Sequence, residues 1–254
     1  MASSGTAIFT LTRDQLIGEA YRKARITAEG TSPSVTQISE ASSRLNMLIK
    51  LCMSKGLQLW CYREYLVPCV ASQTVYTIGP SGADVTAVRP LRVVENGNFI
   101  RQTISGQDFD TPLRLISRAE YMQMGNKTAL GVVNSIYYDS KFDSGAVTSP
   151  SIGHGNLYVY VTPLDATYTV HLNAQRPLYD MNSSTDEFDF PSEWFMYLMY
   201  ALAAEILDDN EGDEARIARL TATAEKYKEE MFDWSVETAS TSFAPDYSVL
   251  GARY

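Results

Sequence analysis

The chain has 254 residues, and its 45% hydrophobic content excludes a disordered protein over most of its length. Acidic residues outnumber basic ones by 30 to 21, which gives a formal net charge of -9. A chain this acidic repels nucleic acid and anionic membranes, so any contact with DNA is expected to be local or passive. The longest apolar run, residues 194–204, is shorter than the roughly 20 residues that cross a bilayer, so we expect no membrane anchor.

The N-terminal segment contains the residues that mark the starts and ends of two helices. Thr12 and Gln15 have the spacing of a capping box, and apolar residues then recur on one helical face. After a polar loop, Ser34 and Gln37 repeat the box and open a second helix with its own apolar stripe. Gly56 suits the position just after the end of that helix.

The C-terminal segment predicts a second pair of helices. Pro191 suits the first turn of a helix over residues 192–209, which is apolar on most sides and is therefore expected to be buried. Gly212 allows a tight turn into the last helix. That helix carries an apolar seam at alternating spacings of three and four, which packs either inside its own subunit or between subunits. The seam consists of Ile217, Leu220, Ala224, Tyr227, Met231 and Trp234.

The middle of the chain changes to the period of β-strands. Residues 168–173 alternate between apolar and polar, whereas residues 157–161 are continuously apolar. Asn96 and Gly97, followed by Asn98, are the strongest hairpin signal, because a type I′ turn needs positive φ at both central positions. Ser117 opens one short helix. Further strands are predicted over residues 65–70, 75–78 and 135–139.

These patterns predict an α+β protein with a helical bundle, an inserted antiparallel β domain and an extended tail. The helical domain is assigned to residues 1–61 and 181–238, and the β domain, a sandwich or small barrel, to residues 62–180. The tail, residues 239–254, has no periodic pattern. Its scattered anchors are Phe243, Pro245, Tyr247, Val249, Leu250 and Tyr254. Ordering it costs about 15–30 kcal/mol in backbone entropy, so we expect it to order only against a partner.

Residues for catalysis, cofactors or metals are few. His154 and His171 are the only histidines, and they have no zinc-ligand spacing, so we expect no metal site. Cys52, Cys61 and Cys69 lie in or beside apolar sequence, which predicts buried thiols without a disulfide. No cofactor-binding or catalytic motif is present, and we expect no enzyme.

An acidic cluster lies between the last two predicted helices. Its spacing breaks the pattern of a calcium loop, so it is interpreted as a solvated corner between helices. The cluster consists of Asp208, Asp209, Glu211, Asp213 and Glu214.

Two other classes of protein remain open on the residues alone. A carbohydrate- or receptor-binding module could use Tyr137, Tyr138, Tyr158 and Tyr160 in the predicted strands, although sheet tyrosines are usually core or interface residues. A cell-wall hydrolase would need two carboxylates in one cleft, whereas Asp and Glu here gather in turns.

Both ends of the chain resemble one family. The first helices read LTRDQLIGEAYRKARI and LNMLIKLCMSKGLQLW, and the last ones DFPSEWFMYLMYALAAEILDD and AEKYKEEMFDW, followed by APDY. This arrangement resembles the head-to-tail adaptors of short-tailed bacteriophages, also called tail tubular protein A or packaged-DNA stabilisation proteins. The likeness covers nearly the whole chain and lies in diffuse structural patterns, with no invariant site residues.

The resemblance implies a structural virion protein without catalysis. It implies a dodecameric ring at the head-tail junction, between the portal protein and the tail nozzle, assembled in the host cytoplasm. Double-stranded DNA would pass through without sequence-specific binding, and the acidic corner is a candidate for the channel lining. The tail would bind the portal or a neighbouring subunit. The β insert, with the expected hairpin at residues 96–98, would face the phage tail.

Overall fold

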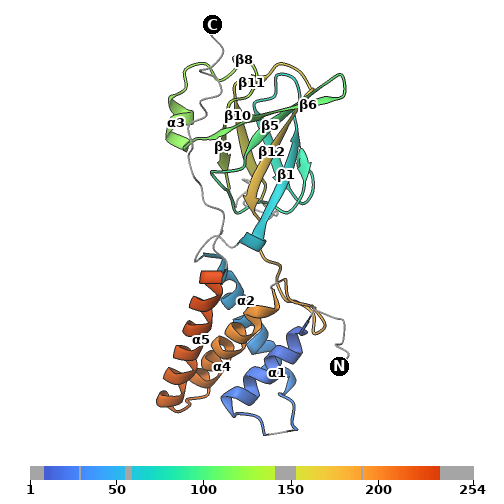
Figure 1. Cartoon of the computed structure of the whole chain (residues 1–254). Helices are drawn as coiled ribbons and strands as arrows, with labels where there is room; N and C mark the ends of the chain where they lie inside the picture. The colour runs from blue at the N-terminus through green and yellow to red at the C-terminus, as the bar shows by residue number, and fades with distance from the viewer. Residues whose placement is uncertain (1–8, 29, 55–58, 141–152, 190, 235–254) are drawn as a thin grey trace, which may run out of the picture.

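The helices and strands of the chain lie in two lobes, as the computed structural model in Figure 1 shows. The structure describes residues 9–28, 30–54, 59–140, 153–189 and 191–234. Helices from both ends of the chain form one lobe, and the strands between them form the other. The predicted α+β fold with an inserted β part is therefore confirmed. Residues 239–254, with all the predicted tail anchors, lie outside the described residues.

Four helices and two 3-10 turns form the helical lobe. They are α1 (Arg13–Ala24), α2 (Val35–Ser54), η1 (Leu59–Cys61), η2 (Ser192–Trp194), α4 (Phe195–Asp209) and α5 (Glu214–Trp234). Both predicted capping boxes are present: the backbone N–H of Thr12 donates to Gln15 Oε1 at 2.9 Å, and that of Ser34 to Gln37 Oε1 at 2.8 Å. The local sequence thus sets where these helices begin.

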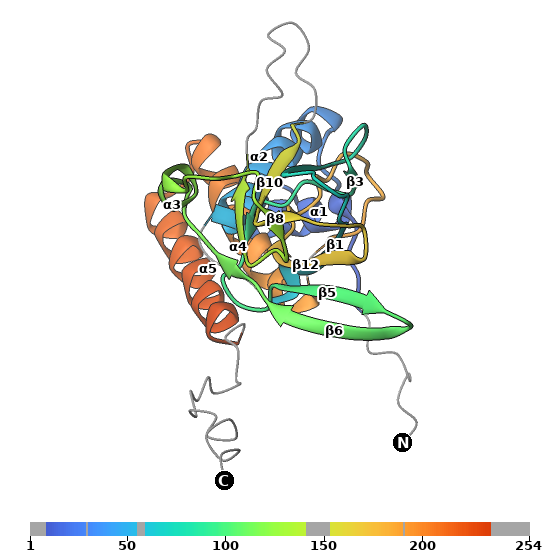
Figure 2. The same cartoon turned by 90° about the horizontal axis from the view of Figure 1, so that it is seen from above.

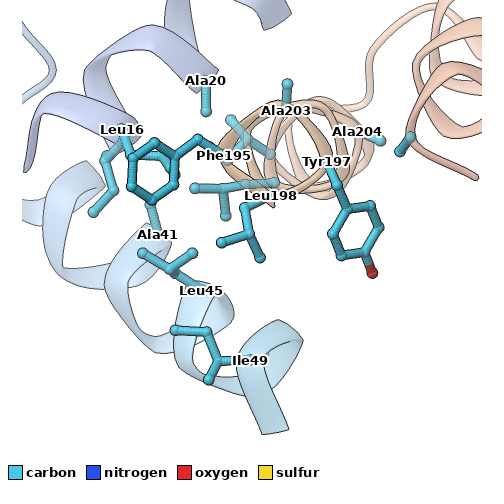
Figure 3. Close-up of a cluster of buried hydrophobic side chains, with 14 of the residues drawn as sticks. Leu16, Ala20, Ala41, Leu45, Ile49, Phe195, Tyr197, Leu198, Ala203 and Ala204 are labelled. Carbon is cyan, nitrogen blue, oxygen red and sulfur yellow. The ribbon is translucent and has the colours of Figure 1, made fainter. Parts of the chain in front are cut away.

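The core of the helical lobe forms around α4. Leu198 of α4 is 0% exposed, and Figure 3 shows Leu16 of α1 and Leu45 of α2 beside it. Trp194, just before α4, contacts Trp60 and Phe232 with ring centroids 6.2 and 5.5 Å apart. Because α1, α2 and α5 all pack on α4, the burial predicted for this helix is confirmed.

The strands form two sheets that share one hydrophobic core. One sheet has the order β1-β12-β5-β6, with β4 also paired to β12, and the other has the order β3-β2-β10-β9-β7. Side chains of both sheets meet in one cluster, for example Val67 and Val170 with Ile78 and Leu157, which makes the lobe a sandwich. Most pairs are antiparallel, whereas β3, β7 and the separate β8–β11 pair are parallel.

The predicted strands of this lobe are present with ends shifted by up to three residues, whereas five further strands among the described residues were not predicted. The strands are β1 (Tyr62–Pro68), β2 (Val75–Gly79), β3 (Val85–Thr86), β4 (Arg92–Val93), β5 (Phe99–Ile104), β6 (Gln107–Pro112), β7 (Arg114–Leu115), β8 (Leu130–Gly131), β9 (Ser135–Asp139), β10 (Gly155–Tyr160), β11 (Thr162–Pro163) and β12 (Tyr168–Gln175). The short helix α3 (Arg118–Gln123) begins after Ser117, as predicted.

The hairpin predicted at Asn96, Gly97 and Asn98 is wrong. The strands that flank it, β4 and β5, do not pair with each other, because both pair with β12 one after the other. Asn98 is buried and its Oδ1 accepts from the backbone N–H of Asn173 at 2.9 Å, which holds this loop against β12. The hairpin forms at Ser105 and Gly106 instead, where φ is +52° and +80° and where β5 turns into β6.

The two lobes are joined where the chain crosses between them twice. Tyr62 and Gln175 are paired at this point, so the crossings are neighbours. Arg176 forms a bidentate ion pair with Asp189, and its backbone N–H donates to the carbonyl of Cys61 at 2.9 Å. Leu178, two residues further on, already packs in the helical core. We therefore place the end of the β lobe at Gln175.

The three cysteines are buried and no disulfide joins them, as predicted. Burial raises the pKa of Cys61 to about 12 and that of Cys69 to about 11. Because only the thiolate is a nucleophile, the native protein is expected to react with a disulfide reagent at pH 8 at least about a hundredfold more slowly than the denatured protein. Titration with and without denaturant measures this, and rapid labelling of the native protein would contradict the burial.

The same shifts predict a loss of stability in base. The unfolded thiols ionise near their ordinary pKa of 9.0, below the folded value of about 12 for Cys61, so stability falls as pH rises through this window.

Candidate interaction surfaces

The predicted seam of α5 packs within its own subunit. Leu220 and Ala224 are buried in the helical core, and the rings of Tyr227 and Tyr200 lie 5.6 Å apart. Ile217 and Met231 are partly buried against the same core. The side chain of Trp234 is outside the described part of the structure. The sequence left open whether the seam packs inside its own subunit or between subunits. Its described members pack in the core of their own subunit.

The predicted acidic corner is exposed to solvent at the turn between α4 and α5. The side chain of Asp209 pairs with Arg44 of α2, which also lies 3.7 Å from Glu205. The turn is tight, with the backbone N–H of Gly212 donating to the carbonyl of Leu207 at 2.9 Å. The remaining members, Asp208, Glu211, Asp213 and Glu214, are exposed. Across the described residues, no group of three or more metal-ligating side chains is assembled.

Three of the four tyrosines considered for ligand binding, Tyr137, Tyr138 and Tyr158, are engaged in packing, and the fourth, Tyr160, is half-buried in β10. Tyr137 and Tyr158 are a cross-strand pair with ring centroids 5.4 Å apart, and Tyr121 of α3 covers them at 5.8 and 5.1 Å. Tyr138 points to the opposite face and donates to the carbonyl of Pro90 at 2.7 Å. These rings therefore hold α3 and the loop at Pro90 to the sheet, and they do not form an open stacking platform for a sugar.

The hairpin of β5 and β6 projects from the described part of the β lobe (Figure 2). Every residue of β6 is exposed, and Ile104 and Phe109 are 48% and 52% exposed. Arg101 binds Asp110 across the pair through two contacts of 2.7 Å, which keeps charge on an otherwise open sheet edge. A projecting edge with apolar side chains is typical of a protein contact.

The helical lobe has apolar surface as well. A groove of about 630 Å³ lies between α1 and α4. Its apolar lining includes Phe9, Leu11, Phe195, Met196 and Met199. On α2, Val35, Met47 and Leu51 are 86%, 69% and 45% exposed. Exposed apolar surface on a structural protein indicates contact with other proteins.

The carboxyl groups give no sign of paired acid-base chemistry. Among the described residues, each carboxyl group with a shifted pKa has it lowered, whereas a general acid needs a raised pKa. Hydrogen bonds from Ser117 lower the pKa of Glu120, and those from Thr167 lower the pKa of Asp165. These groups stabilise a helix start and a turn. The geometry therefore offers no support for a hydrolase.

The projecting hairpin and the apolar groove were not predicted from the sequence. Ser105 followed by Gly106 was a detectable turn signal for the hairpin. The groove had no local signal, because α1 and α4 meet only in the folded chain.

Comparison with known proteins identifies the family. Residues 10–245 match the family model described as SU10 adaptor protein. No curated protein gives a match. Within the described part of the chain, no helix has the length and apolar character needed to cross a membrane. The match covers most of the 254 residues, including the described parts of both lobes. The chain therefore belongs to the SU10 adaptor protein family, a family of bacteriophage structural proteins.

Proposed function

We propose that this protein is a head-to-tail adaptor of a short-tailed bacteriophage, which forms a dodecameric ring between the portal and the tail nozzle at the head-tail junction. The observation that carries the proposal is the division of the chain into two lobes with separate hydrophobic cores, joined at Tyr62 and Gln175. A part that connects two different partners needs two independent surfaces, and each lobe supplies one. Family membership supports the adaptor role in general.

In this proposal the helical lobe forms the ring body and binds the portal. Its exposed apolar residues on α2 and its groove between α1 and α4 provide surface for such contacts. The anchors Phe243, Tyr247 and Leu250 of the C-terminal tail lie outside the described residues, and we assign the tail to the portal or a neighbouring subunit because of its sequence pattern.

The β lobe faces the nozzle in this proposal. Its hairpin of β5 and β6 projects beyond the sandwich (Figures 1 and 2), so Ile104 and Phe109 replace the loop at residues 96–98 as the expected contact. The net charge of -9 suits a channel through which DNA slides without being held. The exposed acidic corner, Asp208 to Glu214, remains the candidate for the channel lining.

Removal of the β lobe tests this division. Replacing residues 62–175 by a short Gly-Ser linker retains every buried residue of the helical core, and the paired ends of the deletion are neighbours. We expect the shortened protein to bind purified portal within about tenfold of the full chain and to lose nozzle binding completely. Sedimentation of each mixture measures both.

The double variant Ile104→Asp, Phe109→Asp is a control that leaves the sandwich in place. It should weaken nozzle binding and leave portal binding unchanged, because both side chains are exposed and far from the helical core. A full-length protein that stays monomeric and ignores portal would contradict the adaptor role. Portal binding lost with the β lobe would reverse the assignment of the lobes.

A further inference from the structure

Basic side chains gather at one place in the helical lobe, although the chain as a whole is acidic. A hollow of about 420 Å³ lies where α1 ends and α5 begins. We name it the basic hollow, and its cationic lining consists of Arg22, Lys23, Arg25, Arg216 and Arg219. The ring of Tyr200 and the side chains of Leu220 and Thr223 complete the lining. These five residues belong to a total of 21 basic residues in a chain with net charge -9, so the local excess is pronounced.

The charges of the basic hollow are only partly balanced. Arg22 pairs with Glu19 at 2.7 Å, and Lys23 Nζ lies 5.0 Å from the centroid of Tyr200. Within the part of the chain that the structure describes, Arg25 and Arg219 form no ion pair. Two guanidinium groups are therefore available to an anion from outside.

Arg216 of α5 connects this group to the end of α1. Its Nη2 donates to the carbonyl of Lys23 at 2.7 Å, whereas its Nε is buried and has no acceptor among the described residues. Burial, followed by the positive charges of Arg25 and Arg219, lowers the pKa of Arg216. A buried donor without an acceptor is unfavourable, which adds to the cost of gathering positive charge here.

The same lobe carries the complementary charge on another face. Glu205, Asp208 and Asp209 form an acidic edge along the last turns of α4, and Arg44 is the one basic side chain paired with it among the described residues. At about 100° per residue, Glu205 and Tyr200 point about 140° apart around α4. By the same measure Asp208 and Asp209 point about 80° and 180° away from Tyr200, so the acidic edge as a whole is directed to another side of α4 than the basic hollow.

We propose that the basic hollow receives the acidic edge of a second copy of this chain. A contact between two different faces is head-to-tail, and its repetition generates a ring when the rotation between copies closes. Guanidinium groups bind carboxylates in pairs of hydrogen bonds, and carboxylates that protrude from a helix end fit a recess. This inference rests on the proposed function, since it names the contact that would hold the ring together.

Charge reversal on either face tests the contact. The hollow-reversed variant is Arg25→Glu, Arg219→Glu, and the edge-reversed variant is Glu205→Lys, Asp208→Lys, with Asp209 kept for its pair with Arg44. Each variant alone places like charges opposite each other and should associate about a hundredfold more weakly than the natural chain. Sedimentation velocity at low salt, with and without portal, measures the association.

An equimolar mixture of the two variants provides the decisive result. The carboxylates introduced at positions 25 and 219 of one variant then meet the ammonium groups introduced at positions 205 and 208 of the other. The unchanged basic hollow and the unchanged acidic edge in the mixture also match, so the mixture should regain assembly. Restoration also shows that both variants fold. Arg118→Glu in α3, an exposed position in the β lobe, is the control and should leave assembly unchanged.

The outcomes separate this contact from the proposed function. If the natural chain forms rings and both variants form them equally well, the contact is refuted while the adaptor role stands. A natural chain that never assembles, with or without portal, refutes both. Failure of the mixture to assemble overturns the contact. If the hollow-reversed variant assembles normally but loses binding to a short DNA duplex, the hollow binds phosphate instead.

Discussion

Leu198→Ala is expected to lower the free energy of unfolding of the helical lobe by about 2–5 kcal/mol. Leu198 is 0% exposed, and α1, α2 and α5 all pack on its helix, so no single neighbour can fill the space that the substitution leaves (Figure 3). Urea unfolding followed by tryptophan fluorescence measures the loss. All three tryptophans, Trp60, Trp194 and Trp234, belong to the helical segments, so their emission reports on this lobe alone.

Leu51→Ala is the matched control. Leu51 lies on α2 and is 45% exposed, so the same chemical change should cost less than about 1 kcal/mol. Equal losses for the two substitutions would show that α4 is not the centre of the core.

Gly155→Ala is expected to destabilise the β lobe by about 3 kcal/mol. A Cβ at this position would lie 2.0 Å from Oη and 2.6 Å from Cζ of Tyr138. The ring of Tyr138 has little freedom to move, because its hydroxyl donates to the carbonyl of Pro90 at 2.7 Å. The substitution must therefore displace β10 from β9 or break that hydrogen bond.

Gly18→Ala serves as the control for this substitution. Gly18 lies within α1 with no atom near the added Cβ, so helix propensity should raise stability by about 0.5–1 kcal/mol. Tryptophan emission follows the helical lobe. Tyrosines lie in both lobes, so the part of the near-ultraviolet circular dichroism transition that tryptophan emission does not share follows the β lobe. Gly155→Ala should shift only that part. A common shift of both signals would mean that the lobes unfold as one unit, which would contradict the independent cores.

Independent cores have a consequence for an adaptor. Each lobe can adjust its contacts to one partner without repacking the other, because the connection between them is limited to the neighbouring crossings at Tyr62 and Gln175 and the ion pair of Arg176 with Asp189. Under the proposed function, variation in a nozzle or a portal would then require changes in one lobe only.

The features that the sequence determined are local ones. The capping boxes at Thr12, Ser34 and Ser117 depend on side chains three residues apart, and their hydrogen bonds form as predicted. The apolar stripes of the helices predicted which faces are buried, since periodicity is a property of the chain itself. The alternation in β12 predicted the burial of Tyr168, Val170 and Leu172, whereas His171, on its predicted polar face, is buried as well. Burial of the three thiols followed from the same patterns.

Strand pairing was decided by tertiary structure. Gly97 has the positive φ that its pattern predicted, +85°, but Asn96 does not, and residues 95–97 form a bend in place of a type I′ turn. Both β4 and β5 pair with β12, so the chain keeps the same direction past residues 96–98. The chain reverses its direction at Ser105 and Gly106, between β5 and β6.

The surfaces that carry the proposals also arise only in the folded chain. The basic hollow combines Arg25 from the end of α1 with Arg216 and Arg219 from α5, and nothing in either segment indicates the other. Composition alone described an acidic chain that avoids anions. Charge acts through distance in space, and packing on α4 brings these residues together, so the tertiary structure alone placed a positive surface on a negative protein.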